Sequence, residues 1–471
     1  MAAVIETDYL VLGTGACAMA FVDTLLTESP HAQVVMVDRH HRPGGHWNDA
    51  YPFVRLHQPT EWYGVESREL GDGSRENSGI NAGLTSLASG AQVMAHFDQV
   101  MTQRFLPSGR VRWFPKTEHI EKDGHTHKFR SLLTGAVQTV RVRRKFVNVT
   151  HARTETPSTR PPRYKVLPGV QCIPLNALPK VERPYRNYTV VGAGKTGMDA
   201  CIWLLENGVP HDRIRWIVPR DPWMLDRANL QPGPQGWRRY FGASVAQLDA
   251  IAQARDIPDL FRRLEESGVL MRLDTNVTPT TYRCAVVSRG ELAQLQKVGE
   301  IVRLGRVRAI EPSRVVLEQG DVPADTDTLY IDCSASAIQP LPKVPIFEAD
   351  TINILMVRTC QPLFSASVIG WVESHVPDVG EQNALCTPVR GPELPIDFLR
   401  MWAPTLMNTM RWQQNAQLRA WLGQSRLNAQ AVVLKGVEIT PEVQDFLKLA
   451  GAAIGAAGTR LPQLLAMSQA A

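Results

Sequence analysis

Two short glycine-rich stretches are the residues of this 471-residue chain whose types and spacing point most directly to chemistry. GTGACA covers residues 13–18 and GAGKTG covers residues 192–197, and both fit the pattern G-x-G-x-x-G/A. In this pattern the first glycine permits a tight turn, the second lets backbone amides approach a pyrophosphate, and the small third residue lets a helix pack on a strand. Both stretches therefore predict dinucleotide binding at a helix N-terminus.

Each stretch is followed by a charged residue that is placed to read an adenosine ribose. QVVMVDR at 33–39 is an apolar run that ends at Asp38, where the fingerprint has an acid for a ribose hydroxyl. RIRWIVPRD at 213–221 presents Arg220, and a guanidinium there suits a ribose 2′-phosphate. The second stretch is therefore predicted to bind NADPH, although the adjacent Asp221 leaves NADH open.

Two other patterns resemble functional sites and are rejected. GKT at 194–196 is not a phosphate-binding P-loop, because that motif needs a glycine where this chain has Thr189. His119, His125 and His127 flank an Asp-Gly turn without a carboxylate or cysteine at metal-ligand spacing. They are predicted to lie in a solvated hairpin, and no metal site is expected.

The elements that must position these residues follow from apolar spacing. Residues 8–26 and 188–206 each read as a strand, a glycine turn and a helix. Residues 109–150 read as alternating strands joined by DG and TG turns, and the chain from Leu394 onward reads as helices. Within that tail, LAGAAIGAAG at 449–458 is too short to span a bilayer and is predicted to be a small-residue helix packed on the body.

Composition excludes several classes of protein. The chain is 44% hydrophobic and 21% charged, which predicts two or three globular domains. Its net charge of +5 comes from scattered arginines, so neither a nucleic acid nor an anionic membrane is an expected partner. The seven cysteines include no C-x-x-C, which favours a reducing compartment and argues against a zinc ribbon or a dithiol relay. With no export signal visible, a cytoplasmic location is expected.

Two complete fingerprints in one chain resemble the flavoproteins with two dinucleotide-binding domains, and most closely the branch of flavin-containing monooxygenases, Baeyer-Villiger monooxygenases and N-hydroxylases. The resemblance covers most of the chain. It is carried by GTGACA with Asp38-Arg39, by the GG-x-W of Gly44 to Trp47, by GAGKTG, and by DTLYIDCSAS at 327–336. The last stretch resembles the family segment in which a strand leads the chain back to the flavin domain.

The resemblance implies an α/β fold in which an NAD(P)-binding Rossmann-like domain, at 185–325, is inserted into an FAD-binding one, at 1–184 and 326–471, with a helical C-terminal segment. It also implies which residues bind each cofactor. The residues expected at FAD are Gly13, Gly15, Ala18, Asp38, Arg39, Gly45, His46, Trp47, Gln58 and Asp332. Those expected at NADPH or NADH are Gly192, Gly194, Lys195, Thr196, Gly197 and Arg220.

The sequence departs from this family in two places. The linker YKVLPGVQCIPLNALP at 164–179 has Gly169 but not the histidine of the family signature F-x-G-x-x-x-H, which argues particularly against Baeyer-Villiger chemistry. Where the family presents an asparagine over the flavin, this chain has His57 and Gln58. Gln58 is suited to hold the N5 proton of a reduced flavin, and His57 is suited to take a substrate proton.

The resulting hypothesis is an FAD- and NAD(P)H-dependent oxidoreductase, a monooxygenase that acts on a small molecule through a C4a-(hydro)peroxyflavin and uses O2. One alternative is a dehydrogenase or reductase that uses the same cofactors without oxygenation. Another is a nucleotide-binding protein without turnover. The sequence does not identify the substrate, and it leaves open whether the protein is a homodimer. PDLFRRLEES at 258–267, for example, suits a helix that caps the nicotinamide and a dimer contact equally well.

Overall fold

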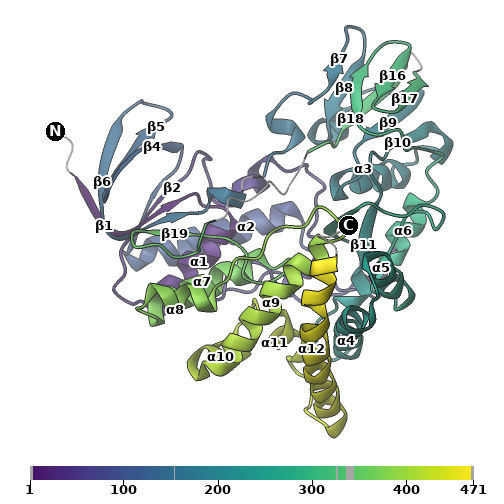
Figure 1. The fold of residues 1–471 in the computed structure, drawn as a ribbon. Helices are drawn as coiled ribbons and strands as arrows, with labels where there is room; N and C mark the ends of the chain where they lie inside the picture. Colours follow the sequence, from purple (N-terminus) through teal and green to yellow (C-terminus); the bar gives the residue numbers. More distant parts are fainter. Residues whose placement is uncertain (1–3, 153, 325–326, 336–343, 468–471) are drawn as a thin grey trace.

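Each glycine stretch follows a central strand of its own sheet, in a computed structural model that describes residues 4–152, 154–324, 327–335 and 344–467. β1 (Ile5–Leu12) leads into the first stretch, and β9 (Asn187–Val191) leads into the second. The two sheets lie apart, with the helices of the C-terminal segment below them (Figure 1). The chain is therefore built from two sheet-centred units, as the paired fingerprints predict.

The first sheet has the strand order β3-β2-β1-β6-β5-β4, and β19 also pairs with β6. β1, β2, β3, β6 and β19 form its parallel part, whereas β4 and β5 are antiparallel to their neighbours. Besides β1, its strands are β2 (Val34–Val37), β3 (Val111–Phe114), β4 (Thr117–Asp123), β5 (Thr126–Ser131), β6 (Val137–Asn148) and β19 (Thr351–Asn353). The alternating strands predicted at 109–150 are confirmed.

Two helices bury one face of the first sheet. α1 (Ala16–Glu28) and α7 (Pro362–His375) pack against each other, although they lie far apart in the sequence. Gly370 permits this packing, because a Cβ there would lie only 3.0 Å from the backbone oxygen of Phe21. α2 (Gly90–Val100) lies in the long excursion between β2 and β3.

The second sheet is wholly parallel and has the order β14-β10-β9-β18-β8. Besides β9, its strands are β8 (Gln171–Pro174), β10 (Ile214–Ile217), β14 (Glu300–Val302) and β18 (Thr328–Asp332). Because β8 and β18 lie outside 185–325, this sheet is larger than the range predicted for the inserted domain. Residues 325 and 326, where that boundary was placed, lie outside the described residues, as does the proline-containing stretch at 336–343.

Two smaller sheets and three helices, besides α4 (Trp237–Gln253), accompany the second sheet. One small sheet has the order β12-β11-β13 and the other β17-β16-β15-β7. Their strands are β7 (Lys165–Val166), β11 (Pro222–Asp226), β12 (Leu270–Met271), β13 (Thr281–Val287), β15 (Val307–Ile310), β16 (Arg314–Leu317) and β17 (Gly320–Pro323). The helices are α3 (Lys195–Glu206), α5 (Ile257–Glu266) and α6 (Arg289–Leu295). No strand from β7 to β18 joins the first sheet in the part of the chain that the structure describes. The chain therefore returns to the first sheet at β19.

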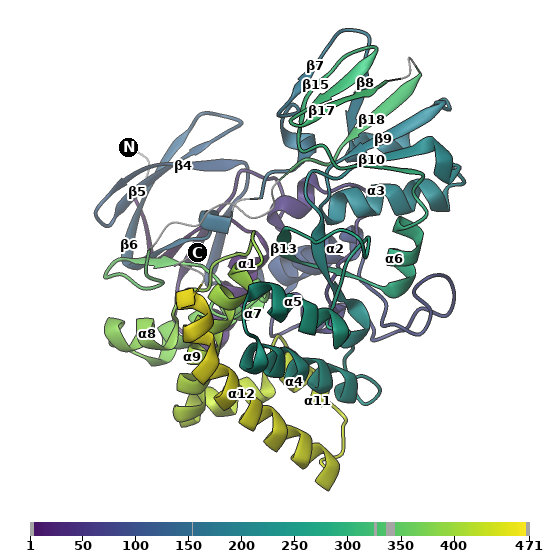
Figure 2. The same cartoon turned by 45° about the vertical axis from the view of Figure 1, so that its right-hand side comes forward.

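The C-terminal segment is helical, as predicted. Its helices are α8 (Val379–Leu385), α9 (Asp397–Gln414), α10 (Ala416–Gln424), α11 (Ala429–Leu434) and α12 (Pro441–Met467). The small-residue stretch of α12 packs on α4 (Trp237–Gln253) and α9, with Ala453 and Ala457 buried (Figure 2). Among the described residues, no helix is long and apolar enough to cross a membrane.

The histidine hairpin corrects one expectation. The β4–β5 hairpin forms with its turn at Asp123 and Gly124, as predicted. His127, however, is only 1% exposed, its ring stacks on Phe146, and its Nδ1 lies 3.0 Å from Nε2 of His119. The prediction of a solvated hairpin is therefore wrong for His127, because alternation on β5 turns its ring toward the apolar face of β6.

Candidate functional site

The first glycine turn has the geometry of a pyrophosphate cradle. Gly13 has φ +106° and donates its N–H to the Val37 carbonyl at 2.8 Å. A Cβ at Gly13 would meet nothing within 4 Å, so space is open in front of the turn. Gly15 is the N-cap of α1 and provides no side-chain cap, in contrast to Ser89, which caps α2. The first amides of α1 are therefore free of a side-chain partner, which suits an anion.

The Gly44-Gly45 pair packs directly against this turn. Gly44 donates its N–H to the Thr14 carbonyl at 2.9 Å, and Gly45 has φ +57°. A Cβ on Gly45 would lie 2.8 Å from Cα of Gly15. Gly44 and Gly45 therefore let their backbone pack directly on the backbone of the first turn. This contact fixes the start of the segment that follows Gly45.

Asp38 lies beside the first turn, but its carboxylate is already saturated. Oδ2 accepts from the Thr14 N–H at 2.6 Å and from the Thr14 hydroxyl at 2.9 Å. Oδ1 accepts the His40 N–H at 2.7 Å, and Nδ1 of His40 lies 3.0 Å away. Burial raises the pKa of Asp38, but these bonds outweigh it and hold the pKa below its usual value. All four acceptor positions of the carboxylate are thus used within the protein.

His40 joins Asp38 to a second acid. Its Nε2 lies 2.9 Å from Oδ2 of Asp49, at the end of the short helix η1 (Gly45–Asp49). The hydrogen bond to Asp38, and then the one to Asp49, raise the pKa of His40 to about 9, against the opposing effect of burial. A ribose hydroxyl at this end of the site would therefore meet an imidazolium between two carboxylates, and sequence reasoning missed both His40 and Asp49.

The remaining residues predicted at the first site are spread around the turn. Ala18 is buried in α1, whereas Arg39 is exposed and forms an ion pair with Glu118 at 2.7 Å. Nε1 of Trp47 donates to the Tyr63 hydroxyl at 2.7 Å, and His46 stacks on Trp47. These two contacts fix the Trp47 ring, which can then form one wall of the site.

The second glycine turn repeats the geometry of the first. Gly192 has φ +123° and donates its N–H to the Ile217 carbonyl at 3.0 Å. A Cβ on Gly197 would lie 2.1 Å from the Gly192 oxygen, so this position requires glycine. Gly194 is the N-cap of α3 without a side-chain cap, and a Cβ there would meet nothing within 4 Å. The second turn therefore also offers uncapped amides and open space to an anion.

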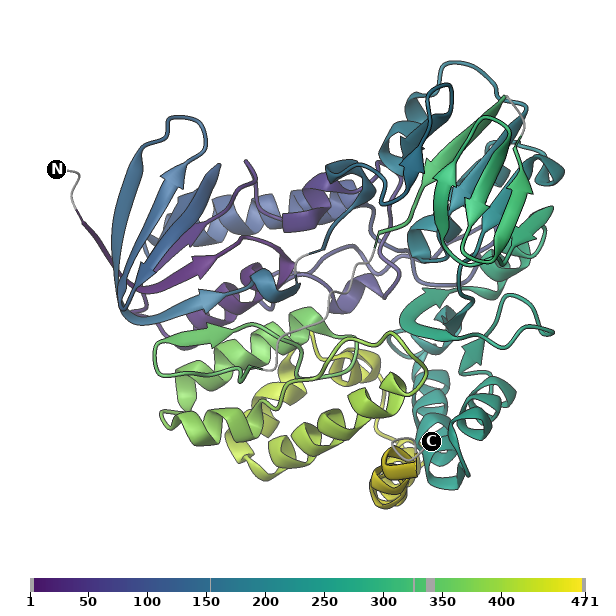
Figure 3. The same ribbon diagram turned by 45° about the horizontal axis from the view of Figure 1, so that its top comes forward.

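The segment after Gly45 connects the two units. Figure 3 shows the purple and blue chain between β2 and β3 crossing from the first sheet toward the second. At the far side, the Tyr51 hydroxyl donates to Asp199 on α3, and Asp199 also pairs with Lys195. Phe53 stacks on Trp203 of α3 with ring centroids 5.1 Å apart. Sequence reasoning missed Tyr51 and Asp199, because neither belongs to a motif.

His57 lies at this junction. Its side chain is accessible to solvent, yet the protein around it desolvates the ring, and together with the positive charge of Lys195 this lowers the pKa of His57 to about 4. His57 from the first unit is thus electrostatically coupled to the first residue of α3, with the half-buried Gln58 beside it.

Arg220 lies just beyond β10, as predicted, and belongs to a cluster. Its Nη2 donates to Oε1 of Glu393 at 2.8 Å, and Arg283 donates to the same oxygen at 3.2 Å. The adjacent Asp221 is buried, and both its carboxylate oxygens accept from Arg303. Asp221, the acid whose position leaves NADH binding open, is therefore already paired within the protein. In contrast, the guanidinium groups of Arg220 and Arg283 share one exposed glutamate.

Asp332 lies in the second unit, at the carboxyl end of β18. It is 1% exposed; Oδ1 accepts the Ser334 N–H at 3.0 Å, and Oδ2 has no hydrogen-bond partner. The next carbonyl, that of Cys333, is where a Cβ on Gly192 would collide, at 2.6 Å. Asp332 therefore borders the second turn, although the resemblance implies a contact with FAD.

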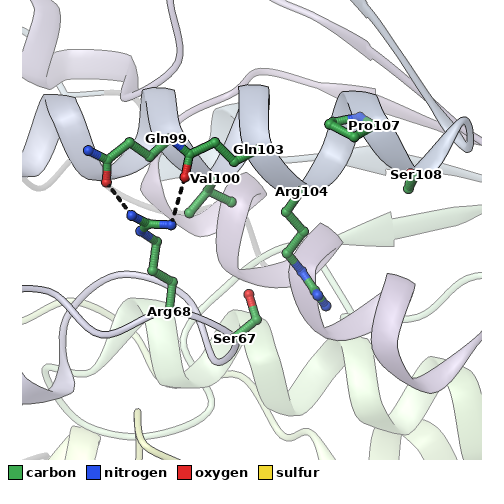
Figure 4. A pocket seen from close by; sticks show the side chains of 8 residues that line it. All are labelled: Ser67, Arg68, Gln99, Val100, Gln103, Arg104, Pro107 and Ser108. Carbon is green, nitrogen blue, oxygen red and sulfur yellow. Dashed lines mark hydrogen bonds between the residues drawn. The ribbon is translucent and has the colours of Figure 1, made fainter.

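A recess of about 420 Å³ on the outer side of α2 is separate from both turns. Figure 4 shows Arg68 in it, bonded to Gln99 and Gln103, with Arg104 and Ser67 nearby. Arg104 and Ser67 both bond to the buried Asp23. The polar groups of this recess satisfy one another, and none of the predicted site residues lines it.

One disulfide links the two units. Cys284 of β13 is bonded to Cys360, which lies just before α7. The cysteine spacing did not predict this pair, because its members are 76 residues apart. Among the described residues, no group of three or more His, Cys, Asp or Glu side chains is arranged to hold a metal ion.

The chain has relatives in mycobacteria. It is 47% identical over 462 residues to uncharacterized proteins of Mycobacterium bovis and Mycobacterium tuberculosis, a match that covers 98% of this chain and 85% of each relative. No family model matches the chain.

Solved structures of flavin monooxygenases resemble the fold. The ε-caprolactone-bound cyclohexanone monooxygenase has a TM-score of 0.51 and 16% identity, over 82% of this chain and 93% of that one. A flavin-containing monooxygenase from Stenotrophomonas maltophilia has a TM-score of 0.46 and 13% identity, over 82% of this chain and 100% of that one. The α/β fold with several parallel-strand sheets and a helical C-terminal segment matches that of the cyclohexanone monooxygenase, as predicted for the fold class.

Proposed function

We propose that this chain, which belongs to one family with these mycobacterial proteins, is an FAD- and NAD(P)H-dependent oxidoreductase, and specifically a monooxygenase of a small molecule. The observation that carries the proposal is the pair of uncapped glycine turns, joined by a segment whose Tyr51 hydrogen-bonds to Asp199 of α3 in the second unit. Such an arrangement serves a flavin and a nicotinamide that must meet.

The first unit fits FAD at its pyrophosphate, since Gly13 and the amides of α1 offer open space and uncapped donors. The ribose would lie against Asp38, His40 and Asp49, where a hydroxyl must exchange with an existing hydrogen bond. When bound there, FAD would accept a hydride from the nicotinamide and deliver electrons to oxygen or to a substrate.

His57 is proposed to accept a proton from the substrate. With a pKa of about 4, its imidazole is neutral at physiological pH and has a free lone pair. Desolvation by the surrounding protein, and then the ammonium of Lys195 that pairs with Asp199, lower the pKa of His57 and so keep the ring neutral. Gln58 is proposed to hold the N5 proton of the reduced flavin through its side-chain amide.

The central test is spectroscopic. Purified protein should show flavin absorbance, and anaerobic NADPH should bleach it faster than NADH does. On admission of air, the H2O2 released per NADPH should be near one without substrate and should fall when a substrate is oxygenated. If H2O2 stays stoichiometric for every compound that accelerates turnover, the protein is an oxidase or dehydrogenase. If FAD is bound but NADPH never bleaches it, the protein binds nucleotides without turnover.

The preference for NADPH is proposed to rest on Arg220 and Arg283. A 2′-phosphate would replace Glu393 as the partner of both guanidinium groups. Arg220→Ala should raise the KM for NADPH about 10-fold and leave the KM for NADH unchanged. Arg215→Ala is the matched control, because Arg215 is also ion-paired, to Glu300, but lies near the amino end of β10. Equal effects on NADPH and NADH would refute the assignment.

A further inference from the structure

Arg358 is a buried cation in the loop between β19 and α7. The residue is 7% exposed. Its guanidinium lies over the rings of Phe364 and Trp412, 4.3 Å and 5.0 Å from their centroids. Its Nη1 donates to the neutral side-chain oxygen of Asn428 at 2.8 Å. Two aromatic faces and one amide therefore hold the group in place.

Among the described residues, this guanidinium has no acidic ion-pair partner. No carboxylate among the described residues forms an ion pair with it within 4.0 Å, and a guanidinium has five N–H donors. Burial lowers the pKa of Arg358 to about 10, and the group that opposes this effect is Tyr240 rather than an acid. Arg358 stays charged at neutral pH, and a buried charge without a partner is costly.

Two other enclosed arginines also form no ion pair within 4.0 Å among the described residues, but acids lie near each of them. Arg227, 2% exposed, interacts electrostatically with Glu291 and Glu76. Arg426 interacts with Glu66, whose Oε2 accepts its backbone N–H at 2.9 Å. Arg358 differs from both because the group that opposes the lowering of its pKa is Tyr240 rather than an acid.

The surroundings of Arg358 offer an apolar wall and further donors. Tyr240 of α4 faces it across the boundary between the units and contacts Trp62 edge-on, with centroids 6.3 Å apart. α7 begins at Pro362, four residues later, and its N-cap, Gln361, provides no side-chain hydrogen bond. A ligand at this place would therefore meet a fixed cation, aromatic rings and the N-terminal end of a helix dipole.

We propose that Arg358 binds the carboxylate of an apolar or aromatic organic acid, and that such acids are the substrate class of this protein. The word substrate rests on the proposed function, whereas the carboxylate site itself does not. A carboxylate matches the geometry of a guanidinium, and the half-buried ring of Tyr240, with Trp62 edge-on to it, offers an apolar surface. The loop that carries Arg358 follows β19, which belongs to the sheet of the first unit.

The test compares an acid with its neutral amide. Benzoate and benzamide are titrated by calorimetry into the FAD-loaded protein, and the flavin spectrum is recorded in the same samples. Wild type should bind benzoate about 10-fold or more tightly than benzamide. Arg358→Met should remove this preference, and Arg358→Lys should keep part of it. Equal binding of the two compounds to wild type, or a preference that survives in Arg358→Met, would overturn the proposal.

A matched control separates this site from a general effect of charge. Arg112 also lies over a ring, 5.7 Å from the centroid of Phe114, but is exposed. Arg112→Met should leave the preference for benzoate intact. If Arg358→Met does not fold, the wild-type comparison and Arg358→Lys still decide the question. Binding of benzoate that depends on Arg358 in a protein that NADPH does not reduce would support the site and refute the proposed function.

Discussion

His40 carries a positive charge at neutral pH because carboxylates flank both nitrogens of its ring. Its pKa is raised from 6.5 to about 9, so the folded protein binds this proton more tightly than the unfolded chain does. The stabilisation is therefore complete below about pH 6.5 and is lost as the pH rises through 9. The free energy of unfolding should fall by about 1–2 kcal/mol over that interval, since partial exposure screens the pair.

Thermal unfolding of the protein between pH 6 and pH 9.5 measures this effect. His40→Gln should unfold at a lower temperature at pH 6 and should show a flatter dependence on pH than wild type. His125→Gln, at an exposed histidine in the β4–β5 hairpin, is the control and should follow wild type. An unchanged pH profile in His40→Gln would mean that the two carboxylates do not hold the proton.

At this scale the sequence predicts residue types better than their partners. Asp38 is where the fingerprint requires an acid, and Arg220 follows β10 as expected. The saturation of Asp38 by Thr14 and His40 depends on the shape of the turn, which no spacing encodes. Tyr51 and Asp199 belong to segments that meet only after both units have folded, so their contact has no local signal.

The second glycine turn allows an element to be tested apart from its ligand. Gly197→Ala would place a Cβ 2.1 Å from the Gly192 oxygen, so helix and strand must separate, and we expect a loss of about 1–3 kcal/mol in the free energy of unfolding. Gly194→Ala would place its Cβ in open space at an extended backbone, so its effect on stability should be small.

The same pair of variants separates structure from nucleotide binding. Because the open space at Gly194 is where the pyrophosphate is proposed to lie, Gly194→Ala should raise the KM for NADPH about 10-fold while the melting temperature changes little. Both quantities are measured on the same preparations. An unaffected KM in Gly194→Ala would contradict the proposed position of the nucleotide.

Elements with strong periodicity are predictable, and short ones are not. The strand–turn–helix units around residues 13 and 192, the strands at 109–150 and the helical tail all follow from apolar spacing. β7 and β12 have only two residues each, too few to show a period, and the smaller sheets depend on them. β18 was recognised as a strand, but its place between β9 and β8 is set by tertiary pairing.

At the scale of the molecule, two of the links between the units can be tested separately. On one side, Tyr51 reaches across to Asp199 of α3. Tyr51→Phe keeps the ring contact with Phe53 but removes this hydrogen bond, which should cost about 0.5–1.5 kcal/mol. Because Asp199 also holds Lys195 near His57, the rate of flavin bleaching by NADPH should fall as well. A rate equal to that of wild type would show that this link has no part in bringing the two sites together.

The other link is the Cys284–Cys360 disulfide, which closes a loop of 76 residues and ties β13 to the segment that carries Arg358. Thiol titration of the unfolded protein should find five free cysteines without reductant and seven after reduction, out of the seven in the chain. Reduction should lower the free energy of unfolding by about 2–4 kcal/mol, because the open chain gains conformational freedom when it unfolds. The double variant Cys284→Ser/Cys360→Ser should unfold at this lower value with or without reductant. If seven thiols react before reduction, the link does not exist in the protein, and the loop that carries Arg358 is held by Thr359 and Thr405 instead.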